Sequence, residues 1–292
     1  MKPLRVGLIV KNRPGSVERL RRQCGYFSYD VPEFTWTHMT PGKKFRLNMK
    51  AMRKQGFDLI FHEDGGNWGE YVGDDVPVVY YSVDSTLSDA HYIQRAEQGR
   101  KADLILVDHD RLERFAGGPP VRRWSYCVND KLFYAGEKRI DVGYHCNSSG
   151  VPDGPRAQLR AWLVEHCAAN GYSLSTGHLS VEQYAAALGR ARVVVNLPQA
   201  AGNRPHRVLD AMAAGAALLT APLPDVSGED SRTGVHYAEW QDTSDLAQHL
   251  KSLIAYQRWS DYAEAGALWV QQHTWAVRAQ ELRAIVYEGF GL

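Results

Sequence analysis

The sequence has few cysteines and no long hydrophobic run. Its four cysteines are scattered through 292 residues, with no C-x-x-C pair and no histidine at a zinc-type spacing, so we expect reduced, structural thiols. No apolar run reaches the roughly 18 to 20 residues of a membrane-spanning helix, and the apolar stretch at the amino terminus is too short for a signal peptide. These absences favour a cytoplasmic protein without a transmembrane segment.

The sequence also lacks a large net charge, but its charges are unevenly distributed. The net charge is +1, yet residues 1–54 contain thirteen lysines and arginines and only three acidic residues. A local surplus of positive charge attracts an anionic partner such as phosphate, nucleic acid or a membrane surface. A solvated helix face rich in basic residues is the alternative interpretation.

Strand-like apolar runs alternate with segments of helical periodicity along the chain. In a chain with 44% hydrophobic residues, this alternation predicts an α/β fold with helices packed on parallel sheets. Polar residues at the carboxyl ends of such strands form the site. The first half has expected strands at 4–10, 57–66, 76–85 and 102–110, and expected helices at 16–27, 44–56 and 88–100.

The second half repeats the alternation after a polar connector around residues 128–142. Its first helix begins at Pro155 and ends at Gly171, positions that these two residue types favour. We therefore predict a domain at 1–137 and a second at 138–292. The second half has expected strands in "IDVGYH", "YSLSTG", "RVVVNLP" and "ALLTAP", expected helices at 154–171, 180–191 and 203–216, and a helical remainder.

An ordered series of motifs runs through the second half, from "VNDKLFY" through "DVGYHCNSS", "PRAQLRAWL", "TGHLSVEQYAAALGRARVVVNLP" and "HRVLDAMAAGAALLTAP" to "HTWAVRAQELRAIV". This series resembles the donor domain of GT-B glycosyltransferases, particularly the group 1 enzymes and the CgeB-related glycosyltransferase-like proteins. The first half resembles the family only in its alternation and in "YYSVDS". The resemblance implies two Rossmann-like domains facing a cleft. Residues 1–137 would bind the acceptor, residues 138–292 would bind a nucleotide-sugar, expected to be a UDP-sugar, and the last helix would return to the N-terminal domain.

Within "HRVLDAMAAG", the resemblance implies that Asp210 binds the ribose hydroxyls of the donor. Arg207 lies one turn earlier on the same helix face, and its forked guanidinium suits the diphosphate. The acid is Asp rather than the family's usual Glu, and the first glutamate of the family's E-x7-E pattern falls on Gly202, so a standard retaining mechanism does not follow. An exposed helix ion pair between Arg207 and Asp210 is the alternative.

Two loops complete the expected donor site. Residues 147–149 follow a strand and suit phosphate through hydroxyls and backbone amides, and residues 177–179 align with the family's turn that holds the nucleobase mainly by its backbone. Asn203 and His206 lie at the helix start, where backbone N–H groups favour an anion. The expected donor-binding residues are Asn147, Ser148, Ser149, Gly177, His178, Leu179, Asn203, His206, Arg207 and Asp210.

The catalytic groups are expected at strand ends of the first domain, because the acceptor binds there in this architecture. For an inverting displacement, a base must reach the acceptor hydroxyl while the leaving diphosphate is stabilised. Asp64 is the first choice, because adjacent carboxylates at a glycine-flanked strand end favour a raised pKa. Ordinary capping and turn chemistry is the alternative for every candidate. The candidates are Asp64, Asp84, Glu63 and His91.

The "DHD" segment at 108–110 resembles the metal-binding D-x-D of the GT-A glycosyltransferases, in which two carboxylates hold a divalent ion. It ends the last expected strand of the first domain, far along the chain from the donor motifs. We therefore interpret it as turn and helix capping. No metal and no cofactor besides the nucleotide-sugar substrate are expected.

The basic surplus falls in the expected acceptor domain, in "KNRPGSVERLRR" and "GKKFRLNMKAMRK". The short chain resembles the compact glycosyltransferases with which phages modify hydroxymethylated pyrimidines in DNA. We therefore favour a hexosyltransferase acting on double-stranded DNA, in the host cytoplasm if a phage encodes it. The alternatives are a glycan, membrane-associated, protein or small-molecule acceptor, or a catalytically silent nucleotide-sugar-binding module. The expected acceptor-binding residues are Lys11, Arg13, Lys43, Lys44 and Arg46.

Overall fold

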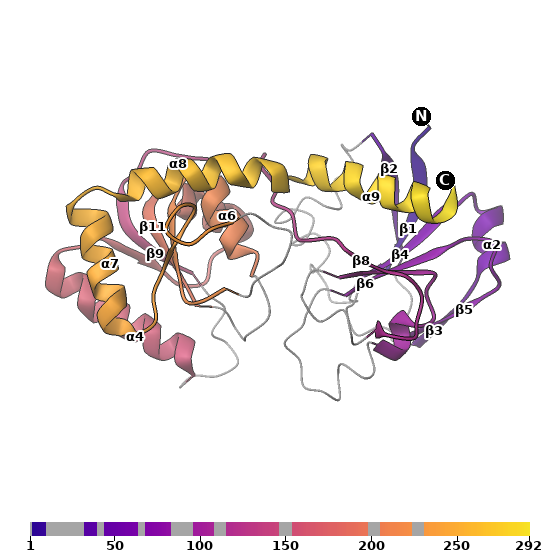
Figure 1. The fold of residues 1–292 in the computed structure, drawn as a ribbon, viewed down its shortest axis with the longest axis horizontal. Helices are drawn as coiled ribbons and strands as arrows, with labels where there is room; N and C mark the ends of the chain where they lie inside the picture. The colour runs from indigo at the N-terminus through magenta and orange to yellow at the C-terminus, as the bar shows by residue number, and fades with distance from the viewer. Residues whose placement is uncertain are drawn as a thin grey trace.

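Two parallel β-sheets, each with its own helices, lie side by side along the long axis of the molecule in the computed structural model (Figure 1). This arrangement confirms the predicted α/β class with two Rossmann-like halves. The structure describes residues 2–9, 32–39, 44–63, 68–82, 96–107, 115–145, 154–197, 205–223 and 231–292.

The first sheet has six strands in the order β2-β1-β4-β6-β7-β8, and every neighbouring pair is parallel. Near-continuous apolar runs form its central strands, as expected when helices or loops cover both faces of a parallel sheet. The strands are β1 (Leu4–Ile9), β2 (Phe34–Met39), β4 (Leu59–Glu63), β6 (Val78–Ser82), β7 (Leu104–Val107) and β8 (Val121–Arg123).

The helix predicted at 44–56 is wrong in its first half. Residues Lys44–Asn48 form strand β3, which pairs in parallel with β5 (Trp68–Val72), and only Met49–Lys54 form a helix, α2. Polar and apolar residues alternate in β3, a period of two that fits a strand. The Asn48 side chain then begins the helix, because its oxygen accepts a hydrogen bond from the Ala51 amide at 3.0 Å.

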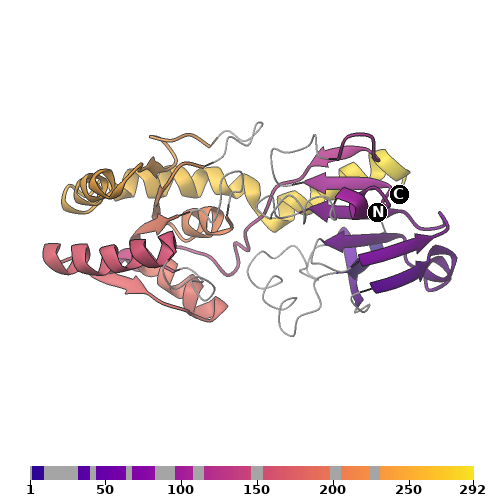
Figure 2. The same ribbon diagram turned by 90° about the horizontal axis from the view of Figure 1, so that it is seen from below.

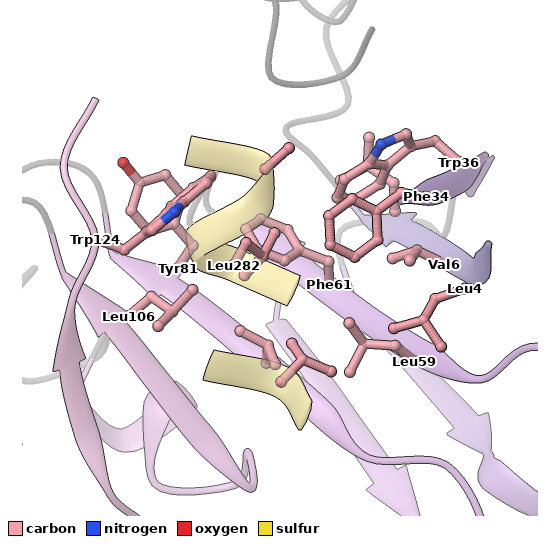
Figure 3. Packing of buried hydrophobic residues seen from close by; sticks show 14 of the residues in the cluster. Leu4, Val6, Phe34, Trp36, Leu59, Phe61, Tyr81, Leu106, Trp124 and Leu282 are labelled. Atoms are coloured by element: carbon pink, nitrogen blue, oxygen red, sulfur yellow. The ribbon is translucent and has the colours of Figure 1, made fainter. Parts of the chain in front are cut away.

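The last helix of the chain, α9 (Trp275–Phe290), packs on one face of the first sheet (Figure 2). Its Leu282 lies among the side chains of the strands, including Phe61 and Tyr81 (Figure 3). The indole N–H of Trp124 donates to the carbonyl oxygen of Arg278 in α9 at 3.0 Å. The helix thus supplies apolar surface that the N-terminal sheet needs, from the far end of the sequence.

The second sheet has the order β10-β9-β11-β12-β13, again with parallel neighbours. Apolar residues of α4 and α7 cover one face, and those of α5, α6 and α8 cover the other. Its strands are β9 (Ile140–Tyr144), β10 (Leu174–Thr176), β11 (Ala191–Asn196), β12 (Ala217–Thr220) and β13 (Ala238–Glu239). Its helices are α4 (Pro155–Asn170), α5 (Val181–Arg190), α6 (Arg207–Ala213), α7 (Thr243–Ala255) and α8 (Trp259–Val270).

Helix ends in this half follow the predicted signals. Pro155 is the first residue of α4, and Gly171 ends that helix in the left-handed conformation, with φ of 69°. The Ser180 side chain caps α5 as part of a reciprocal pair with Gln183. The helix expected at 203–216 is shorter than predicted, because α6 begins at Arg207 and ends at Ala213.

The segments that connect the two sheets lie against each other. The Val128 amide donates to the carbonyl oxygen of His273 at 2.9 Å, and the Trp275 amide donates to the carbonyl oxygen of Val128 at 3.2 Å. Both segments are therefore tied together close to the point where the chain enters α9. The domain boundary between residues 137 and 138 stays a prediction.

Candidate functional site

Polar side chains gather at the carboxyl ends of the strands of the second sheet. Asn196 ends β11 and Thr220 ends β12, and both side chains are fully buried. His145 directly follows β9 and is 5% exposed. Because parallel strands end at the same edge of a sheet, these groups belong to one edge, where ligands of open α/β sheets bind.

A directed chain of hydrogen bonds positions Arg207 at this edge. Its guanidinium Nη1 donates to Asn196 Oδ1 at 2.7 Å, and the Asn196 amide nitrogen donates to Thr220 Oγ1 at 2.8 Å. The Thr220 hydroxyl in turn donates to the carbonyl oxygen of Ala221 at 2.8 Å. Arg207 Nε is buried and has no hydrogen-bond partner among the described residues. The guanidinium is therefore held in place while keeping donor capacity for an anion.

Asp210 lies one turn after Arg207 and is 1% exposed. The Tyr184 hydroxyl of α5 donates to Asp210 Oδ2 at 3.3 Å. Burial, with the Asp210 carboxylate beside it, raises the pKa of Tyr184, so the tyrosine stays a neutral donor. The alternative of an exposed ion pair between Arg207 and Asp210 is thus wrong. A carboxylate has about four lone-pair sites, so Asp210 can accept further hydrogen bonds from a diol.

His145 connects this edge to the segment after β10. Its Nδ1 lies 3.3 Å from the carbonyl oxygen of Gly177, and its Nε2 lies 3.1 Å from Ser175 Oγ. Its ring also packs edge-on against Tyr184, with 6.1 Å between ring centroids. Burial lowers the pKa of His145, and the charges of Arg207 and Arg160 lower it further. The imidazole is therefore neutral at physiological pH.

The expected donor-binding residues divide into described and undescribed groups. The structure brings Arg207, Asp210 and the segment Gly177–Leu179 to the same strand edge. His206 precedes α6, and its ring lies 3.7 Å from that of Tyr126 in the connecting segment. Asn147, Ser148, Ser149 and Asn203 lie outside the described residues.

Sequence reasoning missed His145, Tyr184, Asn196 and Thr220. A signal existed for Asn196 and Thr220, because each is a polar residue that ends an apolar strand of the donor half. Tyr184 gave no signal, since a tyrosine within an amphipathic helix is ordinarily a core residue. His145 lies just before residues 147–149, the segment that the sequence predicts to bind phosphate.

At the first sheet, Glu63 ends β4 and is 6% exposed, whereas Asp64, Asp84 and His91 lie outside the described residues. The neighbouring His62 is fully buried, and its Nδ1 lies 2.5 Å from the Tyr71 hydroxyl. Burial lowers the pKa of His62 to about 3. His62 is thus too weakly basic to take a proton from an acceptor near neutral pH.

The expected acceptor-binding surface is mostly undescribed. Lys11, Arg13 and Lys43 lie outside the described residues, and of Lys44 only the backbone is described, in β3. Arg46 is exposed and pairs with Glu70 at 3.3 Å, so its charge is partly offset. Among the described residues, no cluster of His, Cys, Asp and Glu has the geometry of a metal site, and no helix is long and apolar enough to cross a membrane. The "DHD" segment lies outside the described residues.

Comparison with solved structures identifies the fold of this chain. HepE of Anabaena, solved in complex with UDP, is 12% identical, with a TM-score of 0.66 over 99% of this chain and 100% of that one. Sucrose-phosphate synthase from Thermosynechococcus elongatus is 10% identical, with a TM-score of 0.64 over 99% of each chain. A glycosyltransferase from Rickettsia africae is 8% identical, with a TM-score of 0.64 over 99% of each chain. The fold is therefore the GT-B glycosyltransferase fold.

Sequence comparison finds a family similarity in the second half. No curated protein sequence matches the chain significantly. Residues 149–284 match the family described as glycosyl transferase-like, and this segment contains Tyr184, Asn196, Arg207 and Asp210. This part of the chain, which carries the site at its strand edge, is therefore similar to the glycosyl transferase-like family.

Proposed function

We propose that this protein transfers a sugar from a UDP-sugar to an acceptor hydroxyl. The observation that carries the proposal is Arg207, held by buried Asn196 at the strand edge beside the carboxylate of Asp210. A cation and a carboxylate one helical turn apart match a diphosphate next to a ribose diol. The solved structures of HepE with UDP and with UDP-glucose support this choice of donor.

Each part of the donor has a proposed partner. Arg207 would bind the diphosphate and stabilise the negative charge that grows on it as the bond to the sugar breaks. Asp210 would accept hydrogen bonds from the ribose hydroxyls, with Tyr184 fixing its orientation. Residues 177–179, which follow β10, would hold the uracil through the backbone.

The general base would come from the first sheet. Glu63, at the end of β4, is the described candidate, and its carboxylate would take the proton of the acceptor hydroxyl as that oxygen attacks the sugar. Closure of the two halves over the donor, around the tied connecting segments, would bring acceptor and donor together.

The acceptor proposed from the sequence is a hydroxymethylated pyrimidine in double-stranded DNA. Its support remains the basic composition of residues 1–54. Transfer of labelled sugar to duplex DNA with and without 5-hydroxymethylcytosine tests it, with a charge-reversed Lys43/Lys44/Arg46 variant as control. Absence of duplex binding at low salt, with transfer to another acceptor unchanged in that variant, would refute the DNA assignment.

The donor assignment is tested by calorimetric titration with UDP and by release of UDP from UDP-glucose. Arg207→Ala should weaken UDP binding by about 10- to 100-fold, the cost of a charged hydrogen bond. Asp210→Asn should also weaken it, whereas Arg258→Ala, at an exposed position before α8, should not. A wild-type protein that binds neither UDP nor UDP-sugars would exclude the proposed function. Binding of UDP without turnover on any acceptor would favour a silent binding module.

A further inference from the structure

His145 is buried between the end of β10 and helix α5, and each of its ring nitrogens has a defined partner. Nδ1 faces the carbonyl oxygen of Gly177 at 3.3 Å, and Nε2 faces Ser175 Oγ at 3.1 Å. Both partners belong to one short stretch, because Ser175 lies in β10 and Gly177 directly follows it. A single side chain at the end of β9 thus holds the start of the 177–179 segment.

The chemistry of these partners determines the tautomer of His145. A carbonyl oxygen only accepts hydrogen bonds, so Nδ1 must carry the proton. Since the ring is neutral, Nε2 is an acceptor and takes the hydrogen of the Ser175 hydroxyl. The Gly177 carbonyl therefore selects the tautomer, and the Ser175 hydroxyl, which can donate or accept, is compatible with it.

Anchoring the Gly177 carbonyl also orients the next amide. The oxygen of a trans peptide and the N–H that follows it point in opposite directions across one plane. With the oxygen held toward His145, the N–H of His178 is directed away from the imidazole. Gly177 has φ of 126°, a conformation that residues with a side chain rarely adopt, and a Cβ there would meet no atom within 4 Å. Backbone conformation rather than space therefore accounts for the glycine.

We propose that His145 is the residue that determines nucleobase specificity, acting through the Gly177 carbonyl on the backbone of residues 177–179. This inference rests on the proposed function, in which these residues hold uracil. A fixed peptide presents one pattern of donors and acceptors, and uracil and cytosine present opposite patterns at their pyrimidine N3 and C4 positions. Loss of the anchor would let the peptide rotate and accept both bases.

The same ring links the base to the ribose side of the site. His145 packs edge-on against Tyr184, whose hydroxyl donates to Asp210. Bulk at position 145 therefore supports Tyr184, whereas the Nδ1 hydrogen bond acts on Gly177. Packing against Tyr184 and the hydrogen bond to Gly177 can be tested separately. A substitution at position 145 can keep a polar side chain against Tyr184 and change only the position of the N–H that donates to Gly177.

The test compares His145→Asn with His145→Gln in the full-length protein. The Asn amide nitrogen occupies the position of ring Nδ1 and can donate to Gly177, whereas the Gln amide nitrogen extends to the position of Nε2. We expect Gln to reduce the preference for UDP over CDP by about three- to tenfold, the range for one hydrogen bond, and Asn to retain most of it. Binding of inorganic diphosphate, which needs only the Arg207 side of the site, should be unchanged in both. His166→Gln, at a half-buried position in α4, is the matched control.

The outcomes separate this inference from the proposed function. Equal UDP-to-CDP ratios in the wild type and both variants would overturn the role of His145. Parallel loss of diphosphate and UDP binding in His145→Gln would also overturn it, because the residue would then support the whole site rather than the base. A wild type that binds no UDP would instead overturn the proposed function.

Discussion

Acid should destabilise the first half of the protein through His62. This histidine is fully buried, with its ring packed edge-on against Tyr80 at 5.3 Å between centroids. The Gln98 amide donates to the Tyr71 oxygen at 3.3 Å, and the Tyr71 hydroxyl can donate its own hydrogen to the neutral ring of His62 at Nδ1. Protonation of Nδ1 would place a second donor, the Nδ1–H, against the hydroxyl hydrogen of Tyr71. The positive charge would also be buried in the core. The neutral ring is therefore strongly preferred in the folded protein.

The size of the effect follows from the two pKa values of His62. Burial lowers the folded-state pKa to about 3, whereas the unfolded chain has the ordinary value of 6.5. Between these values the unfolded state binds a proton that the folded state does not, so the free energy of unfolding falls as the pH falls. Well below pH 6.5, each pH unit lowers the free energy of unfolding by about 1.4 kcal/mol. Between about pH 7 and pH 5, the free energy of unfolding falls by about 2 kcal/mol.

Urea denaturation followed by tryptophan fluorescence measures this loss, because Trp36 and Trp124 lie in the core on the other face of the same sheet. His62→Asn retains an acceptor for Tyr71 and cannot be protonated in this range, so its loss between the two pH values should be smaller by about 2 kcal/mol. His38→Asn, at an exposed position in β2, is the comparison variant: burial lowers the pKa of His38 as well, but this side chain lies at the surface, so the substitution should remove a much smaller part of the loss than His62→Asn does. The same acid loss in the wild type and in His62→Asn would refute the reasoning.

Three further predictions concern the second half. Thr220→Val removes the hydroxyl that binds Asn196 and should weaken UDP binding by about three- to tenfold in calorimetry, although it need not touch the ligand. EDTA should leave UDP binding unchanged in the same assay, because Arg207 can supply the positive charge; loss of binding restored by Mg²⁺ would contradict this. Gly189→Ala should lower the thermal midpoint by several degrees, because its Cβ would lie 2.8 Å from the backbone oxygen of Tyr134; an unchanged midpoint would contradict the close packing.

Most of the strands that could be predicted from the sequence have side chains buried on both faces, although the half-buried edge strand β10 was also expected. The run Val193–Val195 in β11 is one example, because continuous burial leaves a continuous apolar signature. Strand β3 was missed because its alternating pattern was interpreted together with the true helix that follows it. Its partner β5 was missed too, since a two-stranded pair beside the main sheet has no long apolar run.

The candidate site was predictable only where one local motif carries it. Arg207 and Asp210 lie three residues apart, so their shared face follows from helical spacing. Tyr184 reaches Asp210 from 26 positions earlier, and His145 reaches Gly177 from 32 positions earlier. No spacing rule connects such pairs, because they depend on how α5 and the strand ends fold back to the same edge. All four catalytic candidates, Glu63 included, stay predictions.

The directions of the hydrogen bonds explain why residues remote from a ligand should matter for binding it. Thr220 must donate to Ala221, so its oxygen accepts from the Asn196 amide, and the Asn196 oxygen is then turned toward Arg207. Every group in this series is buried or half-buried, so reversing one bond would leave another without a partner, at a cost of about 1–3 kcal/mol. Arg207 is consequently held in one orientation before any ligand arrives. A guanidinium ordered in advance loses little further conformational entropy when it binds a diphosphate. Thr220 and Asn196 therefore raise the affinity by reducing this entropy loss, without contacting the ligand themselves.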